Sequence, residues 1–342
     1  MPRFGASDPG ARRRAEVEVD GRLLRVTNLD KVLYPVAGFT KGQVIDYYSR
    51  VAPALLPHLR GRALTLRRFP DGAESPGFYA KNRPPGAPDW VRTVALPTTG
   101  GRHARAGAAT IDYLLVDDLP TLVWCANLAA LELHQPQARA AAPRQPTQVV
   151  LDLDPGLPAD MLDCCEVALW LRAALDRLGL PAHPKTSGSK GLALYVGIEP
   201  GPDDDSVKGF ALALAELLER AHPDRVVSRM SRELRGGKVL VDWSQNDAAK
   251  TTIAPYSLRA RPRPTVSTPV SWAEVEGALD AGDPECLVFE AEAVLERVAR
   301  DGDTFSGVLD APRPLPELGD PDHARRRQRE ESPRGRRGPR AG

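Results

Sequence analysis

Three aspartates follow apolar runs of the chain, at positions 152, 154 and 242. Asp152 and Asp154 lie in the stretch VVLDLDPG, and Asp242 ends the stretch KVLVD. Residues two apart on a strand point to the same side, so the first two carboxylates should project together. Carboxylates held this close repel one another and favour a cation between them, and hard oxygen ligands favour Mg²⁺ or Mn²⁺. Taken singly, each aspartate could equally cap a turn or a helix.

The segment KTSGSKG, residues 185–191, combines small, flexible and cationic residues. Ser187, Lys190 and the backbone N–H groups could cradle a phosphate, although the spacing is not that of a P-loop. Strand-end aspartates and a phosphate-type loop together fit two-metal nucleotidyl transfer, in which ions about 3.5–4 Å apart stabilise the attacking and leaving oxygens. Further along, Gln245 and Arg259 could join such a site or be solvated surface groups.

Other residues suit contacts with a nucleic acid. Phe78 and Tyr79 lie beside Lys81 in a Gly/Pro-rich loop, DGAESPGFYAKN, and aromatic rings next to a cation suit base stacking and phosphate contact. The stretch TNLDK offers Asn28 and Lys31 to a phosphate. Each ring could equally fill the core, and TNLDK could equally begin a helix.

The elements that must position these groups can be read from the same sequence. Two alternating runs around Asp20 and Gly21 predict a hairpin, and Thr40 is expected to cap a helix. A second helix is expected over TLVWCANLAALELH, ending at His134, where a histidine is more often a hydrogen-bond partner than a catalyst. From residue 148 onward, apolar strands alternate with amphipathic helices and predict an α/β fold.

Composition sets limits on the class of protein. The chain has 342 residues, 42% hydrophobic and 27% charged, as in soluble globular proteins, and no apolar run approaches the roughly 18 residues that span a bilayer. No secretory signal is apparent, and the four cysteines, expected to be buried thiols, show no zinc spacing, so we expect a cytoplasmic protein. The net charge is +1 although residues 321–342 hold eight arginines, so a nucleic-acid surface must be a local patch.

Seven motifs in order resemble the polymerase domain of bacterial ligase D, in the archaeo-eukaryotic primase superfamily: VTNLDKVLYP, TKGQVIDYY, FYAKN, LDLDPG, KTSGSKGL, VDWSQN and KTTIAPYSLRAR. The resemblance covers about residues 16–312. It implies an α/β primase-type core of two small sheets with flanking helices around a central cleft. It also implies a DNA-dependent nucleotidyltransferase that adds NTPs or dNTPs to primer 3′ ends at gaps or double-strand breaks, in non-homologous end joining or gap filling, with two Mn²⁺ or Mg²⁺ ions.

The same resemblance implies three groups of site residues. The catalytic, metal-binding triad would be Asp152, Asp154 and Asp242. The nucleotide-binding residues would be Ser187, Lys190, His134, Gln245, Arg259 and Arg235. The DNA-binding residues would be Asn28, Lys31 and Lys41 for the 5′-phosphate of a downstream strand, and Phe78, Tyr79 and Lys81 for the template.

One position departs from the family pattern S-G-x-K-G-x-H, because Ala193 stands where that pattern has histidine. Loss of a charge-assisted hydrogen bond there would cost about 1.5–3 kcal/mol, or roughly 10- to 100-fold in nucleotide affinity or rate. The departure leaves a second hypothesis open, a DNA-end-binding or synapsis module with little catalysis. A third is a metal enzyme of another kind, such as a phosphatase or sugar transferase.

The ends of the chain differ in composition from the middle. Residues 1–15 are expected to form a disordered basic arm, residues 16–312 the catalytic domain, and residues 313–342 a disordered Arg/Pro-rich tail. No K-x-D-G ligase motif is present, so a stand-alone form is expected. The expected partners are gapped or broken DNA ends with a 5′-phosphate, NTP or dNTP, Ku and a separate DNA ligase, with no membrane and a place near the nucleoid.

Overall fold

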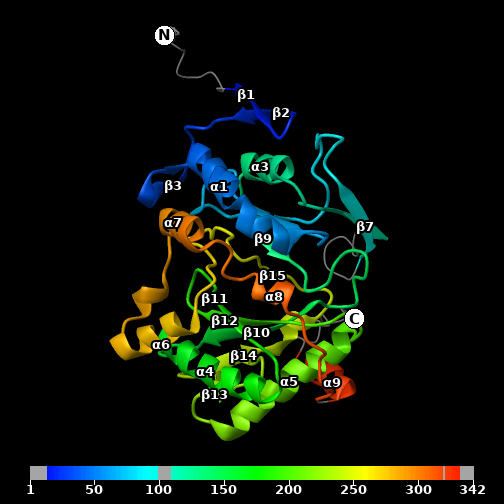
Figure 1. Ribbon diagram of the computed structural model, residues 1–342, viewed down its shortest axis with the longest axis vertical. Coiled ribbons are helices and arrows are strands. Elements are labelled where there is room, and N and C mark those ends of the chain that lie inside the picture. The colour runs from blue at the N-terminus through cyan, green and yellow to red at the C-terminus, as the bar shows by residue number, and fades with distance from the viewer. Residues whose placement is uncertain (1–13, 99–108, 319, 332–342) are drawn as a thin grey trace, which may run out of the picture. The chain divides into compact units, whose positions relative to one another are not determined.

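The computed structural model describes residues 14–98, 109–318 and 320–331 (Figure 1). The chain divides into two compact units, so the predicted catalytic domain, 16–312, contains parts of both. The first unit comprises Met1–Gln135, Ile253–Ser267 and Phe289–Asp303, and the second comprises Pro136–Thr252, Thr268–Val288 and Thr304–Gly342. Of the predicted N-terminal arm, residues 1–13 lie outside the described residues, whereas Arg14 and Ala15 begin strand β1.

The first unit is built around a four-stranded sheet. Its strands, in spatial order, are β15 (Thr252–Ile253), β9 (Ala130–Gln135), β5 (Thr65–Arg68) and β6 (Phe78–Ala80). Helix α1 (Lys41–Leu59) packs against α3 (Leu119–Asn127) and α7 (Ala291–Asp301). The described part of the unit also has three two-stranded sheets: β1 (Arg14–Val19) with β2 (Arg22–Thr27), β3 (Val32–Tyr34) with β4 (Phe39–Thr40), and β7 (Thr93–Pro97) with β8 (Thr110–Leu114). A short 3-10 helix, η1 (Pro35–Ala37), lies between β3 and β4.

Two local predictions for the first unit are confirmed. The β1–β2 hairpin turns at Asp20 and Gly21, which have φ of 47° and 74°, the left-handed values that a tight hairpin turn requires. Thr40 caps α1: its side chain accepts from the Gln43 backbone N–H, while the Gln43 side chain accepts from the Thr40 N–H.

The helix predicted to end at His134 is wrong over its second half. Helix α3 ends at Asn127, Ala129 adopts a φ of 56°, and the chain then continues as strand β9. Leucine, alanine and glutamate favour helix, but Leu133 pairs with Leu66 of β5, and this long-range pairing outweighs local propensity. His134 therefore lies on a strand.

The second unit is built around a five-stranded sheet. Its strands, in spatial order, are β11 (His183–Thr186), β12 (Leu192–Gly197), β10 (Gln148–Pro155), β14 (Val239–Asp242) and β13 (Val226–Val227). All neighbours are antiparallel except β13 and β14. Its described helices are α4 (Met161–Arg177), α5 (Asp204–Ala221), α6 (Trp272–Ala281), α8 (Gly307–Asp310), α9 (Pro321–Glu331), η2 (Arg232–Leu234), η3 (Trp243–Asn246) and η4 (Pro284–Leu287).

Strand β10 has one apolar and one acidic face. Leu151 and Leu153 are fully buried, and α4 and α5 both pack against this strand. Asp152 and Asp154 alternate with them and point to the opposite face. Small sheets flanked by helices confirm the predicted mixed α/β class.

The predicted disordered tail, 313–342, is wrong over residues 321–331, which form helix α9 against α5 (Figure 1). Arg325 pairs with Asp205 of α5 at 2.5 Å, and Lys208 Nζ donates to Gln328 Oε1 at 2.9 Å. The arginine-rich composition of the tail suggested disorder. The partners of these side chains lie on α5, far away in the sequence, so the local composition does not reveal them. Residues 332–342 lie outside the described residues.

Two expectations about the whole chain can be compared with the described residues. None of the helices described combines the length and apolarity needed to cross a membrane. Cys125, Cys164 and Cys165 are buried as expected, whereas Cys286 is exposed.

Candidate active site

The three aspartates lie on one face of the five-stranded sheet. Asp152 of β10 is directly opposite Asp242 of β14, and Asp154 follows two residues later on β10. Paired residues of neighbouring strands point to the same face, so all three carboxylates share it. Asp154 is exposed, but the protein around it removes part of its hydration and raises its pKa; the charge of Asp242 raises it further, and the guanidinium of Arg235 opposes both.

Asp242 is buried and already engaged. Its Oδ1 accepts from Ser244 N at 3.0 Å and from Ser244 Oγ at 2.5 Å, so it caps η3. Its Oδ2 accepts from Gln245 Nε2 at 2.7 Å, and Lys250 Nζ in turn contacts Ser244 Oγ. The capping role left open by the sequence is therefore present, and Gln245 lies directly beside the carboxylate.

The aspartates fit a divalent cation in their chemistry. Carboxylate oxygens are the ligands that Mg²⁺ and Mn²⁺ prefer, and two like charges on paired strand positions are stabilised by a cation. Within the described residues, no three histidine, cysteine or acidic side chains form a group that could hold a metal ion. The metal assignment of the triad thus stays a prediction.

The phosphate-type loop joins β11 to β12 beside the acidic end of β10. Leu192 pairs with Leu153, and a Cβ on Gly191 would lie only 2.2 Å from the Leu153 carbonyl oxygen, so glycine permits this approach. Ser187 Oγ accepts from Ser189 N at 3.2 Å and from Gly191 N at 3.1 Å. Ser187 thus shapes the loop, and Lys190 is exposed at its tip.

Ala193 lies in the same row as the first aspartate. It pairs with Asp152 on one side and with Lys185 of β11 on the other. The Lys185 side chain is buried, with its Nζ 5.3 Å from the centre of the Tyr195 ring. A histidine at position 193 would therefore share the face of the aspartates.

Arg235 is held at the end of β10 by a close backbone approach. A Cβ on Gly156 would lie 2.0 Å from the Arg235 carbonyl oxygen, so only glycine fits there. The Arg235 guanidinium donates to Met230 O at 2.7 Å, and its Nε is buried with no hydrogen-bond partner among the described residues. The structure thus brings this predicted nucleotide-binding residue within electrostatic reach of Asp154.

In the first unit, His134 and Arg259 converge on a residue that the sequence analysis missed, Glu132. His134 Nε2 lies 3.0 Å from Glu132 Oε2, and Arg259 Nε donates to Oε1 at 3.1 Å. Arg67 Nη1 donates to Oε2 at 3.1 Å, and the backbone N–H of Ala260 donates to Oε1 at 3.1 Å. The alternation in LELH would have indicated Glu132, had the segment been recognised as a strand.

The buried carboxylate of Glu132 sets the charge of this cluster. Burial alone would raise the pKa of Glu132, but the hydrogen bond from His134 and the charge of Arg259 outweigh it and hold the pKa well below its usual range. Burial lowers the pKa of His134, and the Glu132 carboxylate only partly opposes this. Glu132 is therefore an anion ringed by donors, two of them guanidinium groups, with a neutral imidazole beside it at neutral pH.

The two predicted template-stacking rings lie on opposite faces of strand β6. Tyr79 pairs with Arg67 and Phe78 with Arg68, and each guanidinium lies over the ring of its partner, at 5.4 and 5.2 Å. Both rings are exposed, Tyr79 to 59% and Phe78 to 46%. The structure does not bring the two rings together, and only Tyr79 shares a face with Glu132. Lys81 follows directly after the strand.

The predicted 5′-phosphate residues do come together. Lys31 N donates to Asn28 O at 3.0 Å, and Lys41 N donates to Lys31 O at 2.8 Å. Lys41 is buried, and its Nζ donates to Thr27 O at 2.6 Å. Burial and the charge of Lys31 lower the pKa of Lys41 to about 8. Lys31 Nζ, which is exposed, lies 3.4 Å from Asp71 Oδ1.

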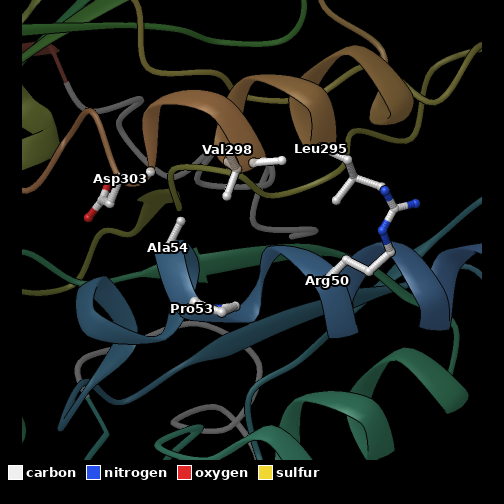
Figure 2. Close-up of a pocket in the computed structure, with 8 residues that line it drawn as sticks. Arg50, Pro53, Ala54, Leu295, Val298 and Asp303 are labelled. Carbon is white, nitrogen blue, oxygen red and sulfur yellow. The ribbon is translucent and has the colours of Figure 1, made fainter.

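A separate hollow of about 330 Å³ lies between α1 and α7 of the first unit (Figure 2). Its floor is apolar, with Arg50 at one end and Asp303 at the other (Figure 2). It contains none of the residues predicted from the sequence. The lining residues are Arg50, Pro53, Ala54, Leu295, Val298, Ala299, Gly302 and Asp303.

Comparison with known proteins identifies the chain. A family model described as "LigD, primase-polymerase domain" matches residues 40–305. The multifunctional non-homologous end joining DNA repair protein LigD of Mycobacterium tuberculosis is 42% identical over 85% of this chain and 37% of its own length. The bifunctional non-homologous end joining protein LigD of Bacillus subtilis is 32% identical over 82% of this chain and 43% of its own length. The chain therefore spans less than half the length of these relatives.

A solved structure indicates the same family as the sequence comparisons. The polymerase domain of Mycobacterium tuberculosis ligase D in complex with DNA has a TM-score of 0.76 and 42% identity, covering 84% of this chain and 98% of that one. Fold and motifs together thus define a primase-polymerase domain. The chain belongs to the LigD primase-polymerase domain family, which confirms the resemblance found in its motifs.

Proposed function

We propose that this chain is a DNA-dependent nucleotidyltransferase that adds NTPs or dNTPs to primer 3′ ends at gaps or double-strand breaks. The names of its relatives, which refer to non-homologous end joining, and the solved relative in complex with DNA support a role in end joining or gap-filling repair. The observation that carries the proposal is the pairing of Asp152 with Asp242, with Asp154 on the same face.

In this proposal, Asp152, Asp154 and Asp242 would hold two Mn²⁺ or Mg²⁺ ions. Such ions, when bound, stabilise the charge on the attacking and leaving oxygens. Lys190 and Arg235 neutralise the triphosphate. Ser187 Oγ keeps the loop in shape by accepting from the backbone N–H groups of Ser189 and Gly191. Gln245 orients the Asp242 carboxylate. The chain's own contribution is thus positioning and charge.

Residues of the first unit are proposed as binding groups in their own right. Arg259 and His134 bind nucleotide phosphate, because Glu132 fixes both in place. The residues proposed for DNA are Asn28, Lys31 and Lys41 for the 5′-phosphate, and Phe78, Tyr79 and Lys81 for the template. Ku and a separate DNA ligase are the proposed protein partners.

Extension of a gapped duplex with a 5′-phosphate, given Mn²⁺ and each NTP or dNTP in turn, tests the proposal. Wild-type protein should extend the primer, and the double variant Asp152→Ala/Asp154→Ala should not. Both proteins should show the same circular dichroism, so that loss of activity is not loss of fold. A folded wild-type protein that extends under none of these conditions would sink the enzymatic claim.

One observation favours a second function, a DNA-end-binding or synapsis module with little catalysis. Ala193 offers no donor at the position beside Asp152. Gel-shift affinity that depends on the 5′-phosphate and persists in Asp152→Ala/Asp154→Ala, together with negligible extension by the wild-type protein, would support this function over the first.

A further inference from the structure

Three side chains form a row across the four-stranded sheet of the first unit. Tyr79 of β6 pairs with Arg67 of β5, and Arg67 pairs on its other side with Glu132 of β9. Paired positions share a face, and His134 lies on that same face two residues beyond Glu132. An exposed ring at the sheet edge is thus connected to a buried carboxylate through one arginine.

The contacts along this row are short and specific. The Arg67 guanidinium lies over the Tyr79 ring at 5.4 Å and donates to Glu132 at 3.1 Å. Tyr79 also meets the His134 ring edge-on, with 5.6 Å between ring centres. Glu132 is 1% exposed, so its orientation is fixed by its partners, chiefly Arg67, Arg259 and His134.

The cluster carries more positive than negative charge. Among the described residues, Arg67 and Arg259 donate to the Glu132 carboxylate, and Arg261 lies within electrostatic reach of it. Burial lowers the pKa of Arg261, the charges of Arg259 and Arg67 lower it further, and the charge of Glu132 opposes them. A bound anion would relieve this repulsion, and a nucleotide phosphate is such an anion.

We propose that Glu132 and Arg67 are positioning residues that couple a base stacked on Tyr79 to nucleotide phosphate bound by Arg259 and His134. This inference rests on the proposed function. A base that fixes the Tyr79 ring also fixes Arg67 above it, and through Glu132 it restrains Arg259. Because such coupling is reciprocal, template should tighten nucleotide binding by the same factor as nucleotide tightens template binding.

The test measures the Kd of the full chain for an NTP, with Mn²⁺, in the absence and presence of a gapped template. Wild-type protein should bind the nucleotide more tightly with template. Arg67→Met, at a partly exposed position, should abolish the gain from template, which is measured as the ratio of its own Kd values without and with template. Glu132→Gln removes the charged acceptor that holds Arg67 and Arg259 in place, so it should also abolish the gain from template.

Asp303→Asn provides the matched control. Asp303 is another largely buried carboxylate of the same unit, accepting from Tyr256 at 2.6 Å and contacting His58 at 2.8 Å. Its substitution should lower stability without changing the gain from template. If Glu132→Gln fails to fold, Arg67→Met decides the matter.

The outcomes separate the coupling from the proposed function. A wild-type protein that extends primers while Arg67→Met keeps the full gain from template overturns the coupling and leaves the function intact. Coupling without any extension supports the inference and refutes the enzymatic function. Absence of nucleotide binding by the wild-type protein overturns both.

Discussion

Asp152 and Asp242 face one another across neighbouring antiparallel strands, as paired residues of β10 and β14. Directly opposed like charges destabilise such a pair by about 0.2–1 kcal/mol. Asp152→Asn should therefore leave the melting temperature unchanged or raise it slightly, while primer extension falls at least about 100-fold if the pair holds metal. Asp176→Asn, at an exposed position near the end of α4, is the control for a general effect of charge. Retained extension by Asp152→Asn would contradict the metal assignment.

Ala193→His should improve nucleotide binding. The new side chain would enter the row between Asp152 and Lys185 and supply a donor to a phosphate oxygen, a gain of roughly 10- to 100-fold in nucleotide Kd. Ala193→Leu adds comparable bulk without a donor and should show no gain. Equal affinities for the two variants would argue that position 193 does not contact the nucleotide.

Affinity for a DNA 5′-phosphate should depend on pH through Lys41. Its pKa of about 8 means that the ammonium loses its proton as the pH rises through 8, and attraction to the phosphate is lost with it. The terminal phosphate becomes a dianion above about pH 6, so affinity should be highest between about pH 6 and 8. Fluorescence anisotropy with phosphorylated and unphosphorylated gapped duplexes measures the difference. Lys41→Met should flatten the profile, and a wild-type profile unchanged up to pH 9 would refute the prediction.

Tyr79 and Phe78 should differ in their effect on template binding, although they are adjacent and both exposed. Tyr79→Ala should weaken binding of a single-stranded template by about 1–3 kcal/mol, the usual value for a base stacked on an aromatic ring. Phe78→Ala should weaken it by less, because the Phe78 ring lies on the opposite face of β6 from Tyr79. Equal losses in the two variants would mean that both faces contact the template.

Gly156→Ala should destabilise the second unit. The added methyl group would lie 2.0 Å from the Arg235 carbonyl oxygen, so the backbone must shift, at a cost of about 1–3 kcal/mol. Gly236→Ala, where a Cβ meets nothing within 4 Å, should be nearly neutral. Urea unfolding followed by circular dichroism distinguishes them. Equal stabilities would show that the turn relaxes freely.

The strands that carry the aspartates could be predicted from the sequence, but their neighbours could not. Apolar runs that stop at Asp154 and Asp242 indicate two strand ends by local pattern alone. That β14 pairs with β10, and that Ala193 falls beside Asp152, depends on register between distant segments. Such register is set by the packing of the whole sheet, which no local pattern contains.

The residues that were missed or misplaced share one cause. The segment LAALELH favours helix by local propensity, but pairing with β5 makes most of it a strand. Because a helix was expected there, the sequence did not indicate that Glu132 and His134 share one face. FYAKN was expected to be a loop, so the alternation that sends Phe78 and Tyr79 to opposite faces was not considered. Local propensity fails in both cases where long-range strand pairing decides.

The docked helix α9 bears on how this protein can be shortened. Lys208 is a buried ammonium whose partners are Asp205, Asp247 and Gln328, and Gln328 lies beyond residue 305, where the family match stops. A chain trimmed to the matched segment would keep the ammonium but remove one acceptor, and it would also take Arg325 away from Asp205. The limits of a family match are thus not the limits of the folded unit, and a minimal version of this protein should extend through residue 331.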